Sequence, residues 1–234
     1  MQGRQQPLSE NRLLASLNTE EYEELAPHLE LVSFPLNEIL FRPDDFLQHV
    51  YFPTTSIISL LTDLSDGSGM EVGLVGREGM VGVSAILGGS ETKVATVQAQ
   101  GEALRLQSRK LREEFRRGAA FQSVLLRYTH ALMTQISQSV VCNARHPIEG
   151  RLARWLLMYQ DRLERDEFML THEFMAHMLG VRRASVSEVA NKLQDRGFVS
   201  YQHGRFKILD RKGLEEFACE CYPIVKEKFD DFLS

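Results

Sequence analysis

The segment between positions 182 and 192 contains several polar side chains whose chemistry is easy to name. Arg183 can donate two parallel hydrogen bonds to guanine, and Glu188 can accept one from the amino group of cytosine. The hydroxyls of Ser185 and Ser187 can bond either kind of base edge. These residue types at these spacings favour a helix that reads base edges in the major groove of double-stranded DNA.

A second set of side chains is suited to holding the DNA backbone instead of reading its bases. Basic side chains and hydroxyls donate hydrogen bonds to phosphate oxygens, and such contacts fix the register of a protein on the duplex. The candidates for phosphate contact are Thr171, Arg182, Lys192, His203 and Arg205. We expect these contacts to supply affinity without sequence preference.

The residues around Gly180 predict the two helices that must position these side chains. Ala176 lies four residues before this glycine, where two crossing helices need a small side chain. Val186 and Val189 follow at spacings that turn both toward a core. Thr171 is a good N-cap for the first helix. The pattern therefore predicts a helix, a glycine turn and a second helix.

The next residues predict a β-hairpin. Val199–Tyr201 and Phe206–Ile208 alternate apolar and polar side chains, and His203-Gly204 between them suits a tight turn. With the two helices, this is the layout of a winged helix-turn-helix over residues 171–208, which indicates DNA as the partner. The alternative is an ordinary three-helix core with polar residues on its surface.

The distribution of charge agrees with this placement. The chain has 234 residues, enough for two compact domains, and a formal net charge of −5. Residues 146–213 nevertheless contain twelve lysines and arginines against nine acidic residues, so the basic excess surrounds the predicted helix-turn-helix. Because this excess is small, we expect affinity to depend on a dimer, which doubles the phosphate contacts.

Other function classes find little support in the sequence. No cationic stretch followed by an apolar run stands near residue 1, and the apolar runs are far too short to span a bilayer. We therefore expect a cytoplasmic protein with no membrane partner. No Walker motif, nucleophile elbow or paired-carboxylate pattern is visible, so we expect no enzymatic activity and nominate no catalytic residue.

Residues 31–106 have the pattern of a small antiparallel β-structure. Short β-rich runs alternate with turn residues at even spacing, which is typical of a barrel or roll. The expected strands are 31–34, 38–41, 49–52, 57–61, 70–75, 94–99 and 103–106. Because helical patterns precede and follow this region, the chain is predicted to have an α+β fold.

Residues 119–143 contain no glycine or proline and predict one helix of about seven turns. Two apolar stripes run along it, so we expect the β-structure on one side and the same helix of a second chain on the other. The residues assigned to the dimer contact are Phe121, Leu125, Tyr128, Leu132, Gln135 and Ser139. The second stripe contains Leu126, Met133, Ile136 and Val140. The alternative is burial of the helix in one large core.

This order of elements resembles the Crp/Fnr superfamily of bacterial transcription regulators over nearly the whole chain. The segments that carry the resemblance are Leu36–Asp45, Val50–Phe52, Gly79–Ala99, Arg151–Leu156 and Thr171–Leu193. It implies a cyclic-nucleotide-binding-like β-roll sensor over residues 1–118, a dimerisation helix over 119–145 and a winged helix-turn-helix domain over 146–234. It also implies a homodimer on a near-palindromic operator, with RNA polymerase as a partner if the protein activates transcription.

The resemblance implies a ligand pocket as well, and here the sequence departs from the cyclic-AMP-responsive members. Their Gly-Glu-Leu and Arg-Ser-Ala stretches correspond to Gly82-Val83-Ser84 and Lys93-Val94-Ala95, and their Thr-Ser pair to Ile136-Ser137. Val83 cannot accept a ribose hydrogen bond, and Lys93 lacks the fork of an arginine. We therefore expect an effector other than cyclic AMP. The candidate pocket residues are Gly82, Val83, Lys93, Val94, Ile136 and Ser137.

The sequence identifies no cofactor. The iron–sulfur centre of fumarate–nitrate regulators needs a cysteine cluster mostly near the N-terminus, and no cysteine precedes Cys142. Isolated histidines in the N-terminal half do not indicate haem. The effector is unknown, and an alternative function is a small-molecule-binding regulatory protein that acts only through protein contacts.

The cysteines are expected to be free thiols, because three of them do not make a disulfide framework. Cys219 and Cys221 offer too few ligands for a structural zinc site, which needs four. His172 and His177 stand five residues apart, roughly 140° around a helix, so they cannot grip one metal ion and are interpreted as helix surface. No metal site is therefore predicted, and a redox role for Cys142 stays open.

Overall fold

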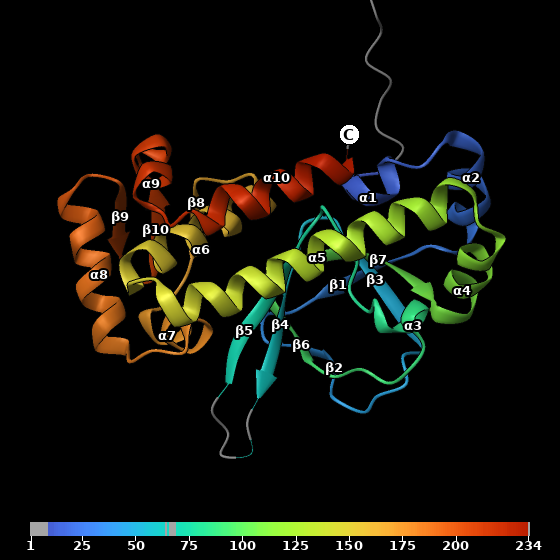
Figure 1. The fold of residues 1–234 in the computed structure, drawn as a ribbon, viewed down its shortest axis with the longest axis horizontal. Coiled ribbons are helices and arrows are strands. Elements are labelled where there is room, and N and C mark those ends of the chain that lie inside the picture. The colour runs from blue at the N-terminus through green and yellow to red at the C-terminus, as the bar shows by residue number, and fades with distance from the viewer. Residues whose placement is uncertain (1–8, 64, 66–68, 234) are drawn as a thin grey trace, which may run out of the picture. The chain divides into compact units, whose positions relative to one another are not determined.

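The structure, a computed structural model, describes residues 9–63, 65 and 69–233 (Figure 1). Helices and antiparallel strands are both prominent, so the predicted α+β class is confirmed. The chain divides into two compact units. The first comprises Met1–Ser59, Val75–Leu132 and Phe229–Ser234, and the second comprises Leu60–Leu74 and Met133–Lys228.

Three short helical segments come first, α1 (Arg12–Ala15), α2 (Thr19–Leu25) and η1 (Ala26–His28). An asparagine N-cap begins α1, because Oδ1 of Asn11 accepts a hydrogen bond from the amide of Leu14. The side-chain amide of Asn11 also donates to the carbonyl oxygens of Pro53 and Gly79. This buried asparagine therefore joins α1 to the β-structure.

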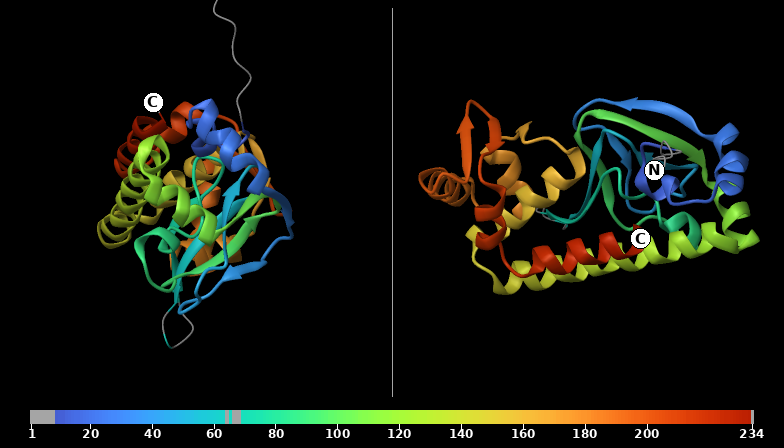
Figure 2. Two further views of the ribbon diagram at one scale, coloured as in Figure 1. Left: turned by 90° about the vertical axis from the view of Figure 1, so that its right-hand side faces the viewer. Right: turned by 90° about the horizontal axis from the view of Figure 1, so that it is seen from above.

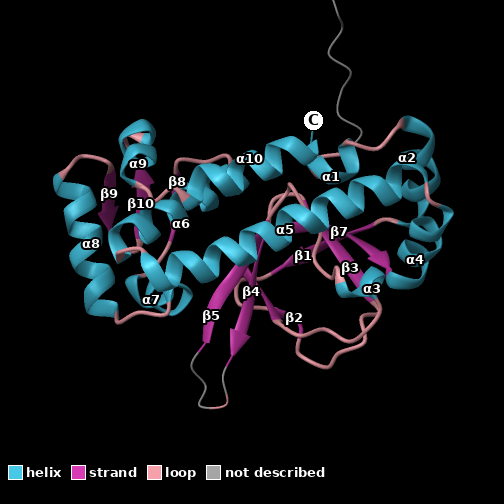
Figure 3. Cartoon of the chain, in the orientation of Figure 1, coloured by secondary structure: helices cyan, strands magenta, loops and turns pink. Residues whose placement is uncertain are grey.

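Two sheets follow along the chain (Figure 3), with the strand orders β1-β7-β3 and β2-β6-β4-β5. The strands are β1 (Glu30–Phe34), β2 (Ile39–Phe41), β3 (His49–Pro53), β4 (Ile57–Asp63), β5 (Gly69–Val75), β6 (Val94–Ala99) and β7 (Gly101–Gln107). β7 pairs antiparallel with β1 and β3, and β6 pairs antiparallel with β2. The core includes the fully buried side chains Val50, Phe52 and Leu106. The predicted β-roll is confirmed, and all seven expected strands are present.

The long helix is also confirmed. α3 (Ser84–Leu87) and α4 (Ser108–Arg117) precede α5 (Ala119–Arg145), which is continuous over 27 residues. Two aromatic rings of α10 (Cys221–Leu233), Phe229 and Phe232, pack against Tyr128 of α5 with centroid distances of 6.4 and 5.7 Å. The end of α10 therefore lies beside α5 in the first unit (Figure 2).

The face of α5 assigned to the dimer contact is corrected by the structure. Its six residues, Phe121, Leu125, Tyr128, Leu132, Gln135 and Ser139, are all buried inside the single chain. The Tyr128 hydroxyl donates to the carbonyl of Met80, and the Gln135 amide donates to the carbonyl of Leu74. This stripe therefore packs on the chain's own β-structure and is not available to a partner.

The second stripe of α5 faces outward. Leu126, Met133 and Val140 are 50%, 60% and 62% exposed, and they follow one another at intervals of seven residues. A seven-residue repeat of apolar side chains keeps one seam on the same side of a helix. The outward face of α5 is therefore the second stripe, and not the stripe that was assigned to the dimer contact.

The second unit contains the remaining elements in the predicted order. They are α6 (Ile148–Leu163), β8 (Glu167–Met169), α7 (His172–Leu179), α8 (Arg183–Asp195), β9 (Val199–Gln202), β10 (Arg205–Ile208) and α9 (Arg211–Phe217), followed by the first part of α10. Met175, Val186 and Leu193 are buried as the spacing predicted. The winged helix-turn-helix is therefore confirmed.

The wing has one strand more than the sequence predicted. The sheet order is β8-β10-β9, so the strand before α7 pairs with the second strand of the hairpin. Phe168 of β8 stacks on Phe206 of β10 with centroids 6.3 Å apart.

Among the described residues, none of the helices combines the length and apolar character needed to cross a membrane.

Candidate nucleic-acid interface

The turn between α7 and α8 is built as the sequence pattern predicts. Thr171 is the N-cap of α7, and its Oγ1 accepts a hydrogen bond from the amide of Phe174. Gly180 ends α7 with a φ of 62°, a left-handed conformation that costs other residues about 1–2 kcal/mol. A Cβ added at Gly180 would also lie 2.7 Å from Cε of Met70. Glycine is therefore favoured here for two independent reasons.

The exposed face of α8 contains the strongest candidates for base readout. Arg183 is the first residue of the helix, and its side chain is 70% exposed. Its guanidinium lies 3.9 Å from the carboxylate of Glu173, an exposed pair that contributes about 1 kcal/mol or less. Glu188, Ala184 and Asn191 are exposed at helical spacing. Asn191 was not among the predicted base contacts, although its position three residues after Glu188 was a usable signal, and asparagine can bond adenine.

Ser187 of α8 has hydrogen-bond partners inside the domain. Its hydroxyl donates to the carbonyl of Arg183 over 3.1 Å and lies 2.8 Å from Nδ1 of His172. These contacts hold the Ser187 side chain between α7 and α8, and its role in base readout stays a prediction. Ser185 is half-buried and keeps its predicted role as a candidate.

His172 was interpreted as helix surface, and that interpretation is wrong. Its ring is half-buried and stacks on Tyr201 of β9 with centroids 4.3 Å apart, while Nδ1 bonds Ser187 of α8. Burial, together with the nearby charge of Arg183, lowers the pKa of His172 from the usual value of 6.5. The ring therefore stays neutral near pH 7 and joins α7, α8 and the wing. Its partners lie on other elements, so spacing within α7 gave no signal of them.

Two of the predicted phosphate contacts have carboxylate partners within the chain. Nζ of Lys192 lies 2.9 Å from Glu149, and the guanidinium of Arg205 lies 2.7 Å from Glu167. Both pairs are exposed to solvent, which screens their attraction, so they add little to stability. A DNA phosphate can therefore compete for either cation at small cost.

The other predicted phosphate contacts lie at the boundaries of elements. Arg182 is the exposed N-cap of α8, and Thr171 is the exposed N-cap of α7. His203 and Gly204 have φ values of 50° and 80°, the positive values that a type I′ hairpin turn requires. His203 is therefore exposed at the tip of the wing, as the sequence predicted.

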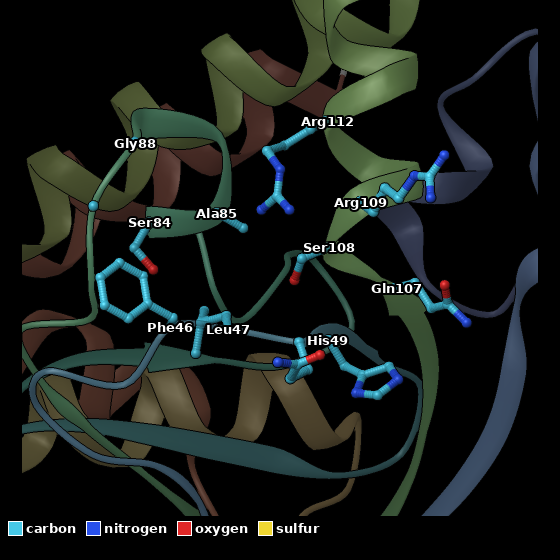
Figure 4. A pocket seen from close by; sticks show the side chains of 12 residues that line it. Phe46, Leu47, His49, Ser84, Ala85, Gly88, Gln107, Ser108, Arg109 and Arg112 are labelled. Atoms are coloured by element: carbon cyan, nitrogen blue, oxygen red, sulfur yellow. The ribbon is translucent and has the colours of Figure 1, made fainter.

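In the first unit, a cavity of about 630 Å³ lies between the loop before β3, α3 and α4 (Figure 4). Arg112 points into it, and Phe46 and Ser84 line the opposite side. Ser108 is only 1% exposed, and its Oγ has no hydrogen-bond partner among the described residues. The cavity lining combines two arginines, Arg109 and Arg112, with a buried hydroxyl and an aromatic ring, which are suited to a small polar ligand.

The six predicted effector residues lie on separate segments, and they do not all belong to the first unit. Gly82 and Val83 lead into α3, Val94 begins β6, and Ile136 and Ser137 lie on the part of α5 that belongs to the second unit.

A carboxylate stands at the predicted pocket. Glu91 is 7% exposed and accepts hydrogen bonds from Ser84 and from the amide of Thr92. The ammonium of Lys93 lies 3.9 Å from the same carboxylate. Lys93, which stands where the cyclic-AMP-responsive members have an arginine, is therefore already paired with a carboxylate inside the chain.

The cysteines of the second unit do not lie apart. Cys142, Cys219 and Cys221 are buried without a disulfide and form one cluster with His146. The expectation of too few ligand side chains near Cys219 and Cys221 is therefore wrong, because Cys142 of α5 and His146, just after α5, lie beside this pair. A hydrogen bond with Cys219 lowers the pKa of the Cys142 thiol.

Comparison with family models finds two matches along the chain. Residues 31–117 match the cyclic nucleotide-binding domain, and residues 150–217 match the Crp-like helix-turn-helix domain. Comparison with curated proteins finds no match. The two matched segments cover the β-roll and the second-unit elements from α6 to α9.

Solved structures share the fold at low sequence identity. FixK2 from Bradyrhizobium japonicum has a TM-score of 0.72 and 17% identity, covering 82% of this chain and 98% of its own. A Crp/Fnr-family regulator from Thermus thermophilus has a TM-score of 0.65 and 20% identity, covering 81% and 98%. The c-di-GMP-responsive regulator CLP from Xanthomonas campestris has a TM-score of 0.62 and 16% identity, covering 82% and 99%.

Proposed function

This chain belongs to the Crp/Fnr superfamily of transcription regulators, and we propose that it binds a near-palindromic operator as a homodimer under the control of its N-terminal unit. DNA binding and regulation of transcription are the common property of the superfamily. The dimer, the operator and the control by an effector are the proposal. Because a regulator of this kind must reach the chromosome, which in bacteria lies in the cytoplasm, the proposal includes a cytoplasmic location.

The observation that carries the proposal is the exposed N-terminal part of α8. Recognition helices of helix-turn-helix proteins contact base edges mainly through their N-terminal residues. Arg183 occupies the first position of α8, and Glu188 follows on the exposed side. With Asn191, these side chains can address guanine, cytosine and adenine by direct hydrogen bonds.

The outward stripe of α5 supports a homodimer. Leu126, Met133 and Val140 have the seven-residue spacing at which two parallel helices pack knobs into holes. A partner helix of identical sequence presents the same seam, as a twofold axis requires. A twofold dimer then places two recognition helices on half-sites about one DNA turn apart.

The effector is proposed not to be cyclic AMP. The buried carboxylate of Glu91 lies beside Lys93 and Ser84, so a cyclic phosphate entering there would meet a negative charge. The CLP regulator is described as responsive to c-di-GMP, so proteins of this fold respond to more than one ligand. The cavity beside Arg112 offers a second place in the first unit for an anionic effector.

Two measurements test the proposal. Gel shifts with random duplex DNA at low and high salt should show binding that weakens steeply as salt rises, because counterions are released from phosphates. Sedimentation should show a dimer that Met133→Lys converts to a monomer, whereas Ala120→Lys, an exposed position roughly 120° around α5 from Leu126, leaves the dimer intact. Absence of binding at low salt would contradict DNA recognition, and an intact Met133→Lys dimer would contradict the interface.

A further inference from the structure

A four-residue cluster lies outside both the recognition helix and the β-roll. The thiols of Cys142, Cys219 and Cys221 and the imidazole of His146 bring their ligand atoms within 4.8 Å of one another. We propose that these four side chains bind one structural zinc ion in the second unit. The proposal is independent of the DNA-binding function, because none of the four residues is a nominated DNA contact.

The local structure explains how the cluster forms. Cys142 lies in the last turn of α5, and His146 follows four residues later, with its amide bonded to the carbonyl of Cys142. Residues four apart on a helix share one face. Cys219 and Cys221 flank the start of α10, and residues two apart in such a turn can direct both sulfurs to the same point. The pair Cys142 and His146 therefore lies beside the pair Cys219 and Cys221, although the two pairs are far apart in the sequence.

The distances suit a tetrahedral ion. With Zn–S near 2.3 Å and Zn–N near 2.0–2.1 Å, a tetrahedron has edges of about 3.8 Å between sulfurs and about 3.5 Å between sulfur and nitrogen. The Cys142 and Cys219 sulfurs are 3.4 Å apart, and Sγ of Cys221 lies 3.6 Å from Nδ1 of His146. Side-chain shifts of about 1 Å or less would complete the geometry.

The surroundings of His146 resemble those of a metal ligand. Its Nδ1 is directed toward a sulfur, while its Nε2 lies 3.1 Å from a carboxylate oxygen of Glu220. Histidines that bind zinc commonly donate their second ring nitrogen to a carboxylate, which fixes the tautomer and raises the basicity of the ligand nitrogen. This contact is a second observation that indicates a metal, since a simple thiol cluster does not require it.

The backbone and charges around the cluster also suit the ion. A Cβ added at Gly150 would lie 3.3 Å from the amide nitrogen of Cys219, so the glycine lets this segment approach α6 closely. The buried arginines Arg151 and Arg154 are near enough for their charges to act on the cysteine thiols. Three thiolates, one neutral imidazole and Zn²⁺ carry a net charge of −1, which one of these two cations is enough to balance.

The ligand set indicates the kind of metal and its role. Three sulfurs and one nitrogen in a tetrahedral arrangement are typical of zinc. Four protein ligands leave no open position, so the ion would hold structure and would not activate water. It would tie the end of α5 to the start of α10, on either side of the winged helix-turn-helix. Binding releases the thiol protons to solvent and involves no change of oxidation state.

The decisive experiment measures zinc in the full chain, purified under reducing conditions without a histidine tag. We expect about one zinc per chain, and replacement by Co²⁺ should produce the intense visible bands of a tetrahedral site with thiolate ligands. Cys219→Ser and His146→Asn should lower zinc occupancy at least about tenfold. The matched control His28→Asn, an exposed histidine of the first unit, should retain the ion. Circular dichroism should establish that each variant is folded.

A second variant keeps the proposal testable if the ligand variants unfold. Glu220 is exposed, so Glu220→Gln should fold normally and raise the zinc dissociation constant about 10–100-fold. Glu216→Gln, an exposed carboxylate nearby in sequence, should leave it unchanged. A chain that takes up no zinc and forms a Cys142–Cys219 disulfide instead would overturn the proposal in favour of a redox pair. Zinc that survives Cys219→Ser, or an unchanged constant in Glu220→Gln, would overturn it as well.

Discussion

Replacement of Arg183 by alanine should remove sequence preference while sparing general affinity for DNA. The side chain is the first of α8 and largely exposed, and its pair with Glu173 at 3.9 Å restrains it by about 1 kcal/mol or less. A bidentate contact to guanine discriminates against the wrong base by about 1–3 kcal/mol. Loss of that contact should weaken operator binding about 5- to 150-fold for each half-site.

In a dimer the loss occurs twice, so the operator affinity should fall about 30-fold to 2 × 10⁴-fold. Random DNA offers this arginine at most a phosphate contact, so affinity for it should fall only a few-fold. The assay is fluorescence anisotropy with an operator selected from a random duplex library and with a scrambled duplex, each at two salt concentrations. The ratio of the two dissociation constants reports the sequence preference.

Two further variants sharpen the test. Arg183→Lys keeps the charge but loses the planar fork, so it should lose most of the preference while keeping general affinity. Lys192→Ala should weaken both duplexes about equally and reduce the salt slope by about one charge per recognition helix. The reasoning is refuted if Arg183→Ala weakens operator and scrambled DNA by the same factor, or if Arg183→Lys retains the preference.

Three further predictions concern the domain that holds the recognition helix. Gly180→Ala should cost at least about 1 kcal/mol in urea unfolding, because the left-handed φ of 62° is unfavourable for alanine; an unchanged midpoint would contradict it. Phe206→Ala should cost about 3–5 kcal/mol, since the ring is fully buried, and a loss below 1 kcal/mol would show that the wing is not packed as described. The pKa of His172 is lower in the folded chain than in the unfolded chain, so the unfolded chain binds the proton first as the pH falls below 6.5. The free energy of unfolding should therefore decline below pH 6.5, and His172→Gln should flatten this decline. Curves of unfolding free energy against pH that run parallel for the two proteins would contradict the prediction.

Several features of the site could be predicted from the sequence because they depend on neighbouring residues. The glycine turn, the N-cap at Thr171 and the His203-Gly204 hairpin obey rules of backbone conformation that a few residues satisfy. The seven strands of the β-roll follow from alternation and turn residues. Arg183 was located because it begins a helix whose buried positions were clear from spacing.

Other features depend on residues that are far apart in the chain. The stacking of His172 on Tyr201 and its bond to Ser187 arise from three different elements, so no local pattern indicates them. The third strand of the wing, β8, was missed because it is short and pairs with a strand beyond both helices. Glu91 was not recognised as a counter-charge to Lys93 because its burial is a property of the folded unit.

The sequence by itself determined the order of the elements, the winged helix-turn-helix and the family resemblance, because periodicity, caps and turns are local properties of a chain. Only the tertiary structure decided which stripe of α5 is buried, since both stripes are apolar and periodicity cannot tell core from interface. It also brought Cys142 and His146 to Cys219 and Cys221, so that a Cys-x-Cys pair that looked too sparse became part of a cluster of four side chains of metal-ligating type. Such contacts form through the packing of distant segments, which spacing along the chain does not encode.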